Sequence, residues 1–409
     1  MTMLRRFASL ARLVVLALLG TLLGWGPVAQ AAPVGVPVPV GQAGQAVSWG
    51  GSEYELQLPA ELRDERFVAV DAGQLHSVAF TDSGAVHAWG DNSLGQTTLP
   101  TLPAGEKVTG ISAGELHSLA VTDAGSVLAW GGDNYYGQRT VPSFPAGEKV
   151  VAVAAGNEHS LALTDAGTVI GWGFNGYGQT TVPTFPAGEK VTAIAAGFGH
   201  SLALTDAGTV VTWGNESNGL AAIPATPAGE KVIAIDTSSE HSLALTDAGT
   251  VLSWGYNGQN QTTVPAIPVG EKITAIAAGD SHSLAVTDAG TLLAWGWNGY
   301  GMTTVPTVPA GQKITALSAG GYHSLALTDA GTLLGWGRND EGQRTVPVLA
   351  VPQRVTAVAV GLFHSLALTD AGTVLAWGSN ADGQTSVPPL PAGEQVTAIA
   401  AGSNHSLAL

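Results

Sequence analysis

Nine histidines recur along the chain, each followed directly by serine, and imidazole and hydroxyl groups are common parts of acid–base centres and metal sites. They are His76, His117, His159, His200, His241, His282, His323, His364 and His405. An active site needs one asymmetric set of groups, whereas these nine share the same local sequence. We therefore expect a structural role, as buried imidazoles paired with backbone groups, and no metal site.

Carboxylates that break the repeated pattern are the other candidates for catalysis. Asp71 and Asp236 replace small residues in a repeated alanine-rich segment, where a pair of acids could serve a lyase or a glycosidase. The Asp of the recurrent Thr-Asp-Ala-Gly string is expected to form turns instead. The chain has no cysteine, which excludes disulfides, thiolate metal sites and a cysteine nucleophile. Because two acids alone make a thin case for an enzyme, we predict a non-enzymatic protein without a cofactor.

Aromatic side chains form a third group, and they could bind a partner without any chemistry. Ten of them lie between the repeated motifs, among many carboxylates: Tyr135, Tyr136, Phe174, Tyr177, Phe198, Tyr256, Trp297, Tyr300, Tyr322 and Phe363. Rings offer a large contact area at low entropic cost and dominate binding hot spots. We expect them to bind an extracellular protein, and the acidic surroundings favour a partner with a basic patch. A glycan that stacks on the rings is the alternative ligand, and rings that merely cover sheet edges are the structural alternative.

The motifs recur every 40 to 42 residues, and a Trp-Gly pair recurs with them from Trp49 to Trp377. In one unit the alternation of side chains predicts strands over 191–196, 200–205 and 209–213. An Asp-Ala-Gly turn closes the second hairpin, and a short fourth strand near Pro224 would lie at the outer edge. A meander of four strands per repeat is a propeller blade, so we predict an all-β propeller of four-stranded blades.

The two ends of the chain predict how the ring closes. The repeats begin with a third strand that ends at Trp49, and they stop after a first and a second strand that end at Leu409. Each end supplies what the other lacks, so the expected ring has eight internal blades and one composite blade, nine in all. A chain cut short at Leu409 that forms an open arc is the alternative.

A meander sends its successive loops to alternate ends of each blade. The loop before each His-Ser pair and the loop after each Trp-Gly pair should therefore share one end, where all ten aromatic candidates fall. The Thr-Asp-Ala-Gly turns and the Pro-Ala-Gly-Glu-Lys connections should share the opposite end, which receives all six lysines.

The first 31 residues have the pattern of a signal peptide. Arg5, Arg6 and Arg12 precede and enter an apolar run over 13–23, and Ala-Gln-Ala at 29–31 fits a signal-peptidase site. We expect cleavage there, and secretion of the protein to the extracellular space or the periplasm.

After cleavage, residues 32–45 would form a lead segment and 46–409 a single propeller domain, which we expect to be a monomer. No later segment is long and apolar enough to span a membrane. Loss of three arginines would leave 12 Lys and Arg against 31 Asp and Glu, a net charge of −19. Such a surface repels phosphates, so we expect no nucleic acid partner.

The repeats resemble those of the regulator of chromosome condensation family. The resemblance rests on Ala-Ala-Gly-x-x-His-Ser-Leu-Ala-Leu-Thr-Asp, Trp-Gly-x-Asn-x-x-Gly-Gln and Thr-Thr-Val-Pro, and it covers about Ala46 to Leu409. The short repeats are most similar to secreted β-lactamase inhibitory proteins of the second type, in which the corresponding loops form an aromatic protein-binding face. The resemblance thus implies a protein-binding propeller. Nine units depart from the seven blades of those relatives, and the wedge and basic surfaces of the exchange factors have no counterpart here.

Overall fold

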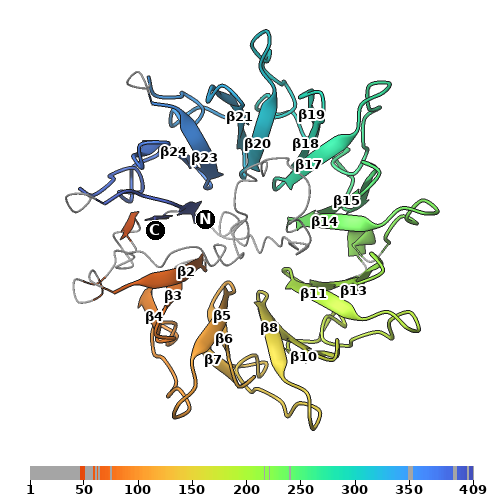
Figure 1. Ribbon diagram of the computed structural model, residues 1–409, viewed down its shortest axis with the longest axis vertical. Helices are drawn as coiled ribbons and strands as arrows, with labels where there is room; N and C mark the ends of the chain where they lie inside the picture. Colours follow the sequence, from red (N-terminus) through yellow and green to blue (C-terminus); the bar gives the residue numbers. More distant parts are fainter. Residues whose placement is uncertain are drawn as a thin grey trace, which may run out of the picture.

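The protein is a ring of nine sheets in a computed structural model. The structure describes residues 47–50, 59, 62, 65–73, 76–215, 217–220, 222–238, 241–348, 353–389, 394–402 and 405–408. These residues form 27 strands in nine three-stranded sheets, with a short 3-10 helix, η3 (Ser217–Gly219), and no helix that could cross a membrane. Figure 1 shows the sheets around a central axis, like the blades of a propeller. The all-β fold and the nine repeats are confirmed. The predicted signal peptide (1–31) and lead segment (32–45) lie outside the described residues.

Each blade contains one strand of each of three kinds. The first strands are β2 (Phe67–Ala72), β5 (Val108–Ala113), β8 (Val150–Ala155), β11 (Val191–Ala196), β14 (Val232–Thr237), β17 (Ile273–Ala278), β20 (Ile314–Ala319), β23 (Val355–Val360) and β26 (Ile399–Ala401). The second strands are β3 (His76–Thr81), β6 (His117–Thr122), β9 (His159–Thr164), β12 (His200–Thr205), β15 (His241–Thr246), β18 (His282–Thr287), β21 (His323–Thr328), β24 (His364–Thr369) and β27 (His405–Ala408). The third strands are β4 (Val86–Gly90), β7 (Val127–Gly131), β10 (Val169–Gly173), β13 (Val210–Gly214), β16 (Val251–Gly255), β19 (Leu292–Gly296), β22 (Leu333–Gly337), β25 (Val374–Gly378) and β1 (Val47–Gly50).

The register of each blade follows from its repeated motifs. In the sheet β11-β12-β13, which is antiparallel throughout, His200 faces Gly214 and Ser201 faces Trp213. The turn between β12 and β13 closes through Gly208, whose φ of 84° is a conformation that glycine adopts without strain. Its N–H donates to the carbonyl of Thr205 at 3.0 Å.

The predicted fourth strand does not form in the blades that the structure describes. The segment after Gln179 instead gives its backbone groups to other partners. Asn175 Oδ1 accepts from the N–H of Thr180 at 3.0 Å, and the carbonyl of Gln179 accepts from Trp213 Nε1 at 2.9 Å. Pro183 has no N–H to offer a ladder. The segment therefore runs beside the third strand without ladder bonds, and each blade has three strands.

Both ends of the chain contribute to one blade. Strand β1 pairs antiparallel with β27, with Trp49 opposite Ser406, and β26 completes the sheet. In Figure 1 the red strand β1 accordingly lies beside the blue C-terminal strands. This blade contacts the next one along the ring, because Trp89 Nε1 donates to Ser48 Oγ at 3.0 Å.

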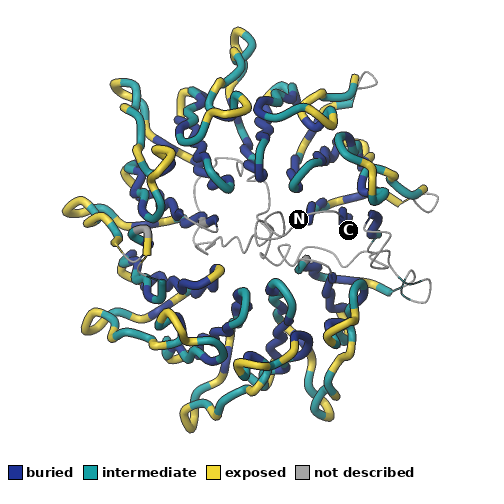
Figure 2. The backbone as a smooth tube through the Cα atoms, turned by 180° about the vertical axis from the view of Figure 1, so that it is seen from behind, coloured by how far each residue is buried: buried dark blue, intermediate teal, exposed yellow. Residues whose placement is uncertain are grey.

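The apolar core is divided into layers between neighbouring blades. One layer joins Leu161 of β9 to Ile194 of β11, Ala203 of β12 and Trp213 of β13, and equivalent layers recur around the ring. Burial of a leucine side chain stabilises a fold by about 1.5–3 kcal/mol. The second strands are buried along their whole described length, whereas the outer tips of the blades are exposed (Figure 2).

The repeated His-Ser pairs connect neighbouring blades through a belt of buried hydrogen bonds. His117 Nε2 lies 2.9 Å from Ser160 Oγ of the next blade, and eight bonds of this kind include one of 3.2 Å between His405 and Ser77. Ser160 Oγ also donates to the carbonyl of Gln138 at 3.0 Å. Because a hydroxyl has one proton, His117 Nε2 must be the donor to Ser160. The predicted structural role is confirmed, although the partner is a serine hydroxyl rather than a backbone group.

Burial keeps these imidazoles neutral. Loss of hydration lowers the pKa to about 3 for His76, His159 and His364, and to about 4 for His117 and His405. An unfolded chain would bind protons near the ordinary histidine pKa of about 6.5, so below that pH the unfolded state binds more protons than the folded state. The stability contributed by the neutral imidazoles is therefore complete above this pH and is lost as the pH falls towards 4.

We predict that the free energy of unfolding falls steeply between pH 6.5 and pH 5.5. Each of these histidines should remove about 1 kcal/mol over that unit, before the carboxylates begin to titrate, because its unfolded-state imidazole is half protonated at pH 6.5 and almost fully protonated at pH 5.5. Urea unfolding followed by circular dichroism from pH 8 to pH 5 measures this dependence. His159→Gln should reduce the slope of the unfolding free energy with pH by the contribution of one histidine. A flat profile between pH 6.5 and pH 5.5 would contradict a belt of neutral imidazoles.

Candidate binding face

Two loops of each blade are joined at one end of the ring. The N–H of Phe174, directly after β10, donates to the carbonyl of Glu158, directly before β9, at 2.8 Å. The same bond joins Arg338 to Tyr322 at 2.9 Å. The loop after each third strand therefore lies against the loop before each second strand, as the meander predicts. We call this end the aromatic face.

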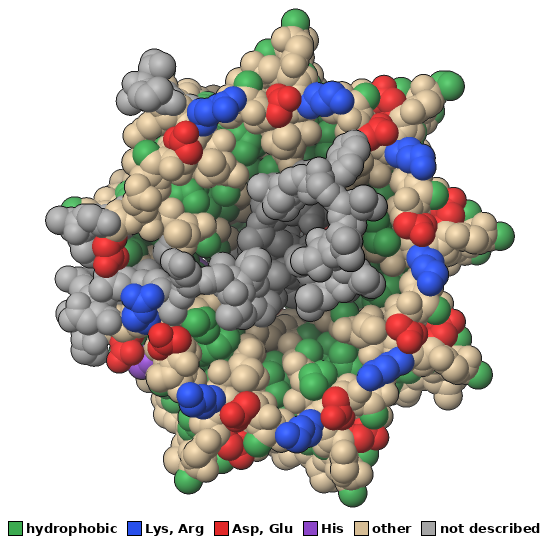
Figure 3. Space-filling view, viewed as in Figure 1, with side chains coloured by type: hydrophobic (Ala, Val, Ile, Leu, Met, Phe, Trp, Pro, Cys, Tyr) green, Lys and Arg blue, Asp and Glu red, His purple; other side chains and the backbone are tan. Residues whose placement is uncertain are grey.

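The lysine-bearing connections lie at the opposite end. The N–H of Lys190 donates to Asp206 Oδ1 at 2.9 Å, and the N–H of Asp206 donates to the carbonyl of Lys190 at 2.8 Å. These two hydrogen bonds therefore join a Thr-Asp-Ala-Gly turn to a Glu-Lys connection. Lys and Arg side chains alternate with Asp and Glu around the rim in Figure 3. The charges at this end are evenly mixed, and no ring from the ten candidates lies in these turns.

Side-chain amides hold the loops of the aromatic face in a fixed shape. Gln179 Oε1 accepts from the N–H of Tyr177 at 3.0 Å, and Asn175 Oδ1 accepts from the N–H of Thr180 at the same distance. Equivalent bonds recur in other blades, such as Asp382 to Gln384 at 2.8 Å. The rings therefore project from loops with little freedom to lose on binding, which lowers the entropic cost of recognition.

Four of the predicted residues form a cluster that we call the tyrosine patch: Tyr135, Tyr136, Phe174 and Tyr177. Ring centroids are 4.7 Å apart between Tyr135 and Tyr136, 4.6 Å between Tyr136 and Phe174, and 5.6 Å between Phe174 and Tyr177. Tyr135 is 79% exposed, and Tyr136 and Tyr177 are exposed as well. Loops of two successive blades thus build one continuous aromatic surface.

Four others form a second cluster, the arginine patch: Trp297, Tyr300, Tyr322 and Phe363, with Arg338 among them. Tyr322 stacks on Phe363 with centroids 6.0 Å apart, and Trp297 meets Tyr300 edge to face at 5.3 Å. The guanidinium of Arg338 lies 5.2 Å from the Tyr300 ring, 5.7 Å from Tyr322 and 5.1 Å from Phe363. These distances are those of cation–π contacts. Our sequence analysis did not single out Arg338.

The remaining two candidates make no ring contact with either patch in the described part of the chain. Phe198 is 46% exposed, and Tyr256 is half-buried. Phe198 still lies close to the tyrosine patch, because a Cβ on its neighbour Gly199 would be 3.2 Å from the Tyr177 ring. The ten predicted residues are therefore two patches of four, with Phe198 beside the tyrosine patch and Tyr256 without a ring contact to either patch.

Carboxylates border the tyrosine patch and respond to its low polarity. Partial burial, and then the charge of Asp133, raise the pKa of Glu158. Desolvation, and then the charges of Glu158 and Asp133, raise the pKa of Tyr136. Asp280 similarly raises the pKa of Tyr322 after desolvation, but there the charge of Arg338 opposes it. Both patches are acidic, and only the arginine patch holds a cation against its rings.

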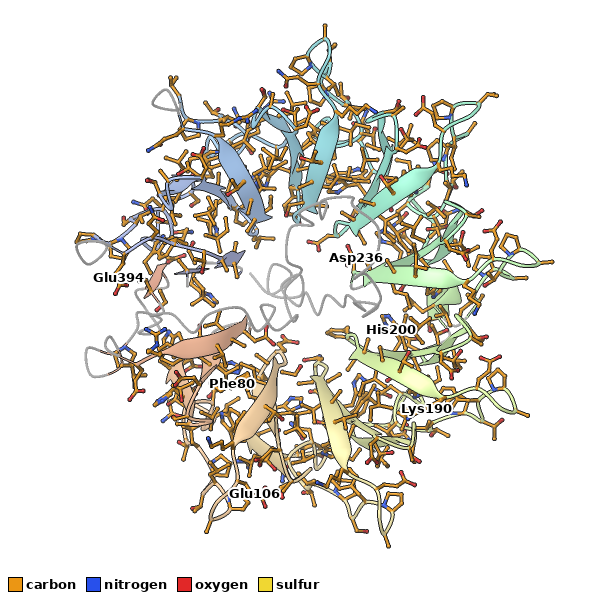
Figure 4. All side chains as sticks on the ribbon, viewed as in Figure 1. Phe80, Glu106, Lys190, His200, Asp236 and Glu394 are labelled. Atoms are coloured by element: carbon orange, nitrogen blue, oxygen red, sulfur yellow. The ribbon has the colours of Figure 1, made fainter. Side chains whose placement is uncertain are left out.

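The carboxylates proposed for catalysis have structural partners. Asp71 Oδ2 accepts from the N–H of Ala113 at 2.9 Å, and Asp236 Oδ2 accepts from the N–H of Ala278 at 2.8 Å, each in the following blade. Figure 4 places Asp236 at the inner end of β14, whereas Asp71 lies in β2, in a blade that is not a neighbour. The two acids are not brought together as a pair. Within the described residues, no cluster of three or more His, Asp or Glu could hold a metal ion.

The fold and these patches define a repeat-built propeller with a chemically distinct loop face. The family model of the RCC1-like domain matches residues 40–409, and the chain belongs to this family. Among solved structures, human WBSCR16 is 19% identical, with a TM-score of 0.51 over 90% of this chain and 99% of that chain. Prp20p from Saccharomyces cerevisiae is 19% identical, with a TM-score of 0.49 over 90% of this chain and 91% of that chain. Comparison with curated proteins finds no match.

A glycine makes room for each ring that follows a Trp-Gly pair. In the strings Phe174-Asn-Gly176, Tyr256-Asn-Gly258 and Trp297-Asn-Gly299 the ring lies over the glycine. A Cβ would come within 2.4 Å of the Phe174 ring at Gly176 and within 2.3 Å of the Trp297 ring at Gly299. Where the residue directly after the Trp-Gly pair is not aromatic, the residue two positions later is not glycine. Ser93 is an example. This pairing is a sequence signal that our sequence analysis missed.

We predict that Gly299→Ala displaces the Trp297 ring from its loop, because the new Cβ would overlap the indole. Trp297 is the one tryptophan outside the Trp-Gly pairs beyond the predicted signal peptide, so fluorine NMR of the 5-fluorotryptophan-labelled protein resolves it. Its signal should shift towards that of a solvated indole. Ser93→Ala is the matched control and should leave the Trp297 signal in place. An unchanged spectrum for Gly299→Ala would show that the ring does not lie over this glycine.

Proposed function

We propose that this chain is a secreted, non-enzymatic propeller that binds a protein partner through its aromatic face. The observation that carries the proposal is the pair of patches, in which partly exposed rings from successive blades contact one another on loops held by Asn and Gln side chains. Exposed apolar surface of this kind usually marks an interaction site. Secretion rests on the signal sequence at residues 1–31.

Charge indicates what kind of partner fits. Asp133, Glu158, Asp280 and Asp340 border the rings, and in the described part of the chain Arg338 is the one cation that lies against them. A partner with a basic patch would gain electrostatic attraction on approach. Membership of the RCC1-like family agrees with a binding role, and the two inner-strand acids already bonded to backbone give no support to a lyase or glycosidase.

We predict that alanine at Tyr135, Tyr136, Trp297 and Tyr300 abolishes capture of the partner from the culture medium of the organism that makes this protein. Each buried aromatic anchor is worth about 2 kcal/mol, or roughly thirtyfold in Kd. Quantitative mass spectrometry of captured proteins measures the loss, after circular dichroism has verified the fold of each variant.

A variant with alanine at Lys107, Lys149 and Lys190 is the control, since these residues lie at the opposite end and should leave capture intact. Equal capture by the wild type and the aromatic variant would refute a docking role for the face. Binding on a glycan array that requires the same rings, with no protein captured, would replace the protein partner by a carbohydrate.

A further inference from the structure

The two patches are built on the same frame but differ at one matched position. Phe174 and Arg338 both follow a Trp-Gly pair directly, and both donate their N–H to the carbonyl of the residue before the histidine, at 2.8 Å and 2.9 Å. One position thus presents a ring and the other a guanidinium at equivalent places in their blades.

The arginine patch shows how a guanidinium lies on this surface. Arg338 contacts three rings, one each from the preceding, its own and the following blade: Tyr300, Tyr322 and Phe363. Its Nε also donates to Asp340 Oδ2 at 2.7 Å. The planar cation is therefore held by aromatic faces and by a carboxylate, the two kinds of group that arginine prefers.

The tyrosine patch has the same two kinds of group and no such cation. Tyr135, Tyr136 and Tyr177 are more than a third exposed, and Asp133 and Glu158 lie close enough to raise the pKa of Tyr136. Among the described residues, every cation–π contact belongs to Arg338. Arg139 of the same loop does not fill this place, because its Nε is buried and its charge acts on His117.

We propose that the tyrosine patch binds an arginine side chain of the partner protein, with the guanidinium against the exposed rings of this patch and its charge balanced by Asp133 and Glu158. The inference rests on the proposed function and specifies its chemistry. Arginine fits better than lysine because its flat, weakly hydrated cation stacks on rings, as Arg338 does in the arginine patch.

The probe is the peptide acetyl-Gly-Arg-Gly-amide, compared with the same peptide containing citrulline, which has the shape of arginine without its charge. The protein is labelled with 3-fluorotyrosine and observed by fluorine NMR. The spectrum should be simple enough to follow each residue, because the chain has seven tyrosines. The arginine peptide should shift the signals of Tyr135, Tyr136 and Tyr177 and leave those of Tyr300 and Tyr322 in place. The citrulline peptide should bind about tenfold more weakly or not at all. Equal shifts from the two peptides, or shifts spread over all tyrosines, would overturn the proposal.

Exchange of the matched residues tests the same idea from within the protein. Phe174→Arg should supply the tyrosine patch with its own cation and abolish its response to the arginine peptide. Arg338→Ala should remove the cation from the arginine patch, so that the arginine peptide can bind there and shift the Tyr300 and Tyr322 signals. Asp133→Asn with Glu158→Gln should weaken peptide binding about tenfold while the rings stay in place. If Arg338→Ala gained no response, these patches would not be arginine sites.

The outcomes separate this inference from the proposed function. Loss of partner capture in the aromatic variant, together with no response to the arginine peptide, would leave a protein-binding face and refute arginine recognition. A specific response at the tyrosine patch, together with equal partner capture by the wild type and the aromatic variant, would support the arginine site and refute the face as the docking surface.

Discussion

The contact between neighbouring blades is the interaction on which the ring depends. At one junction the carbonyl of Gln138 accepts from Trp172 Nε1 at 2.9 Å and from Ser160 Oγ at 3.0 Å, and Ser160 accepts from His117. Apolar burial between blades supplies most of the stabilisation, but it is not directional. The buried polar groups must be paired, so their bonds fix how each blade is set against the next. The repeated histidines therefore take part in the hydrogen bonds that join the blades.

The blade that departs from the repeat keeps the same junction. In the sheet β14-β15-β16, Ser238 replaces the glycine before the His-Ser pair, and its Oγ lies 2.9 Å from His241 Nδ1. The other imidazole nitrogen of His241, Nε2, lies 2.8 Å from Ser283 Oγ. Ser283 Oγ donates its proton to the carbonyl of Gln261 at 2.8 Å, so Nε2 is the donor here as well, and Ser238 Oγ also donates to the carbonyl of His241 at 3.2 Å. The substitution therefore preserves the junction and gives a partner to Nδ1, which lacks one in blades such as that of His159.

The features encoded within one repeat could be predicted from the sequence, and those that depend on neighbouring blades could not. Strands, the turn at Gly208 and the sorting of loops to two ends follow from local patterns. The fourth strand failed because Trp213 of the next blade takes the carbonyl of Gln179, a partner that the local sequence does not show. Likewise, Arg338 meets rings from the blades on both sides of its own, so its cation–π contacts depend on the spacing of blades. The burial of Asp71 and Asp236 against backbone amides of the following blade has the same origin.

This division explains why the ring can be symmetric while its aromatic face is not. A change at a junction removes buried hydrogen bonds and packing, which costs several kcal/mol, whereas a change at an exposed loop position usually costs less than about 0.5 kcal/mol. Phe174 and Arg338 illustrate the freedom of the loops. The same kind of backbone hydrogen bond holds each residue in its own blade, but one presents a ring and the other a guanidinium. The patches consequently differ in charge although their frames match. The tyrosine patch therefore presents rings bordered by carboxylates, whereas the arginine patch also presents a cation, so the two patches would attract different groups.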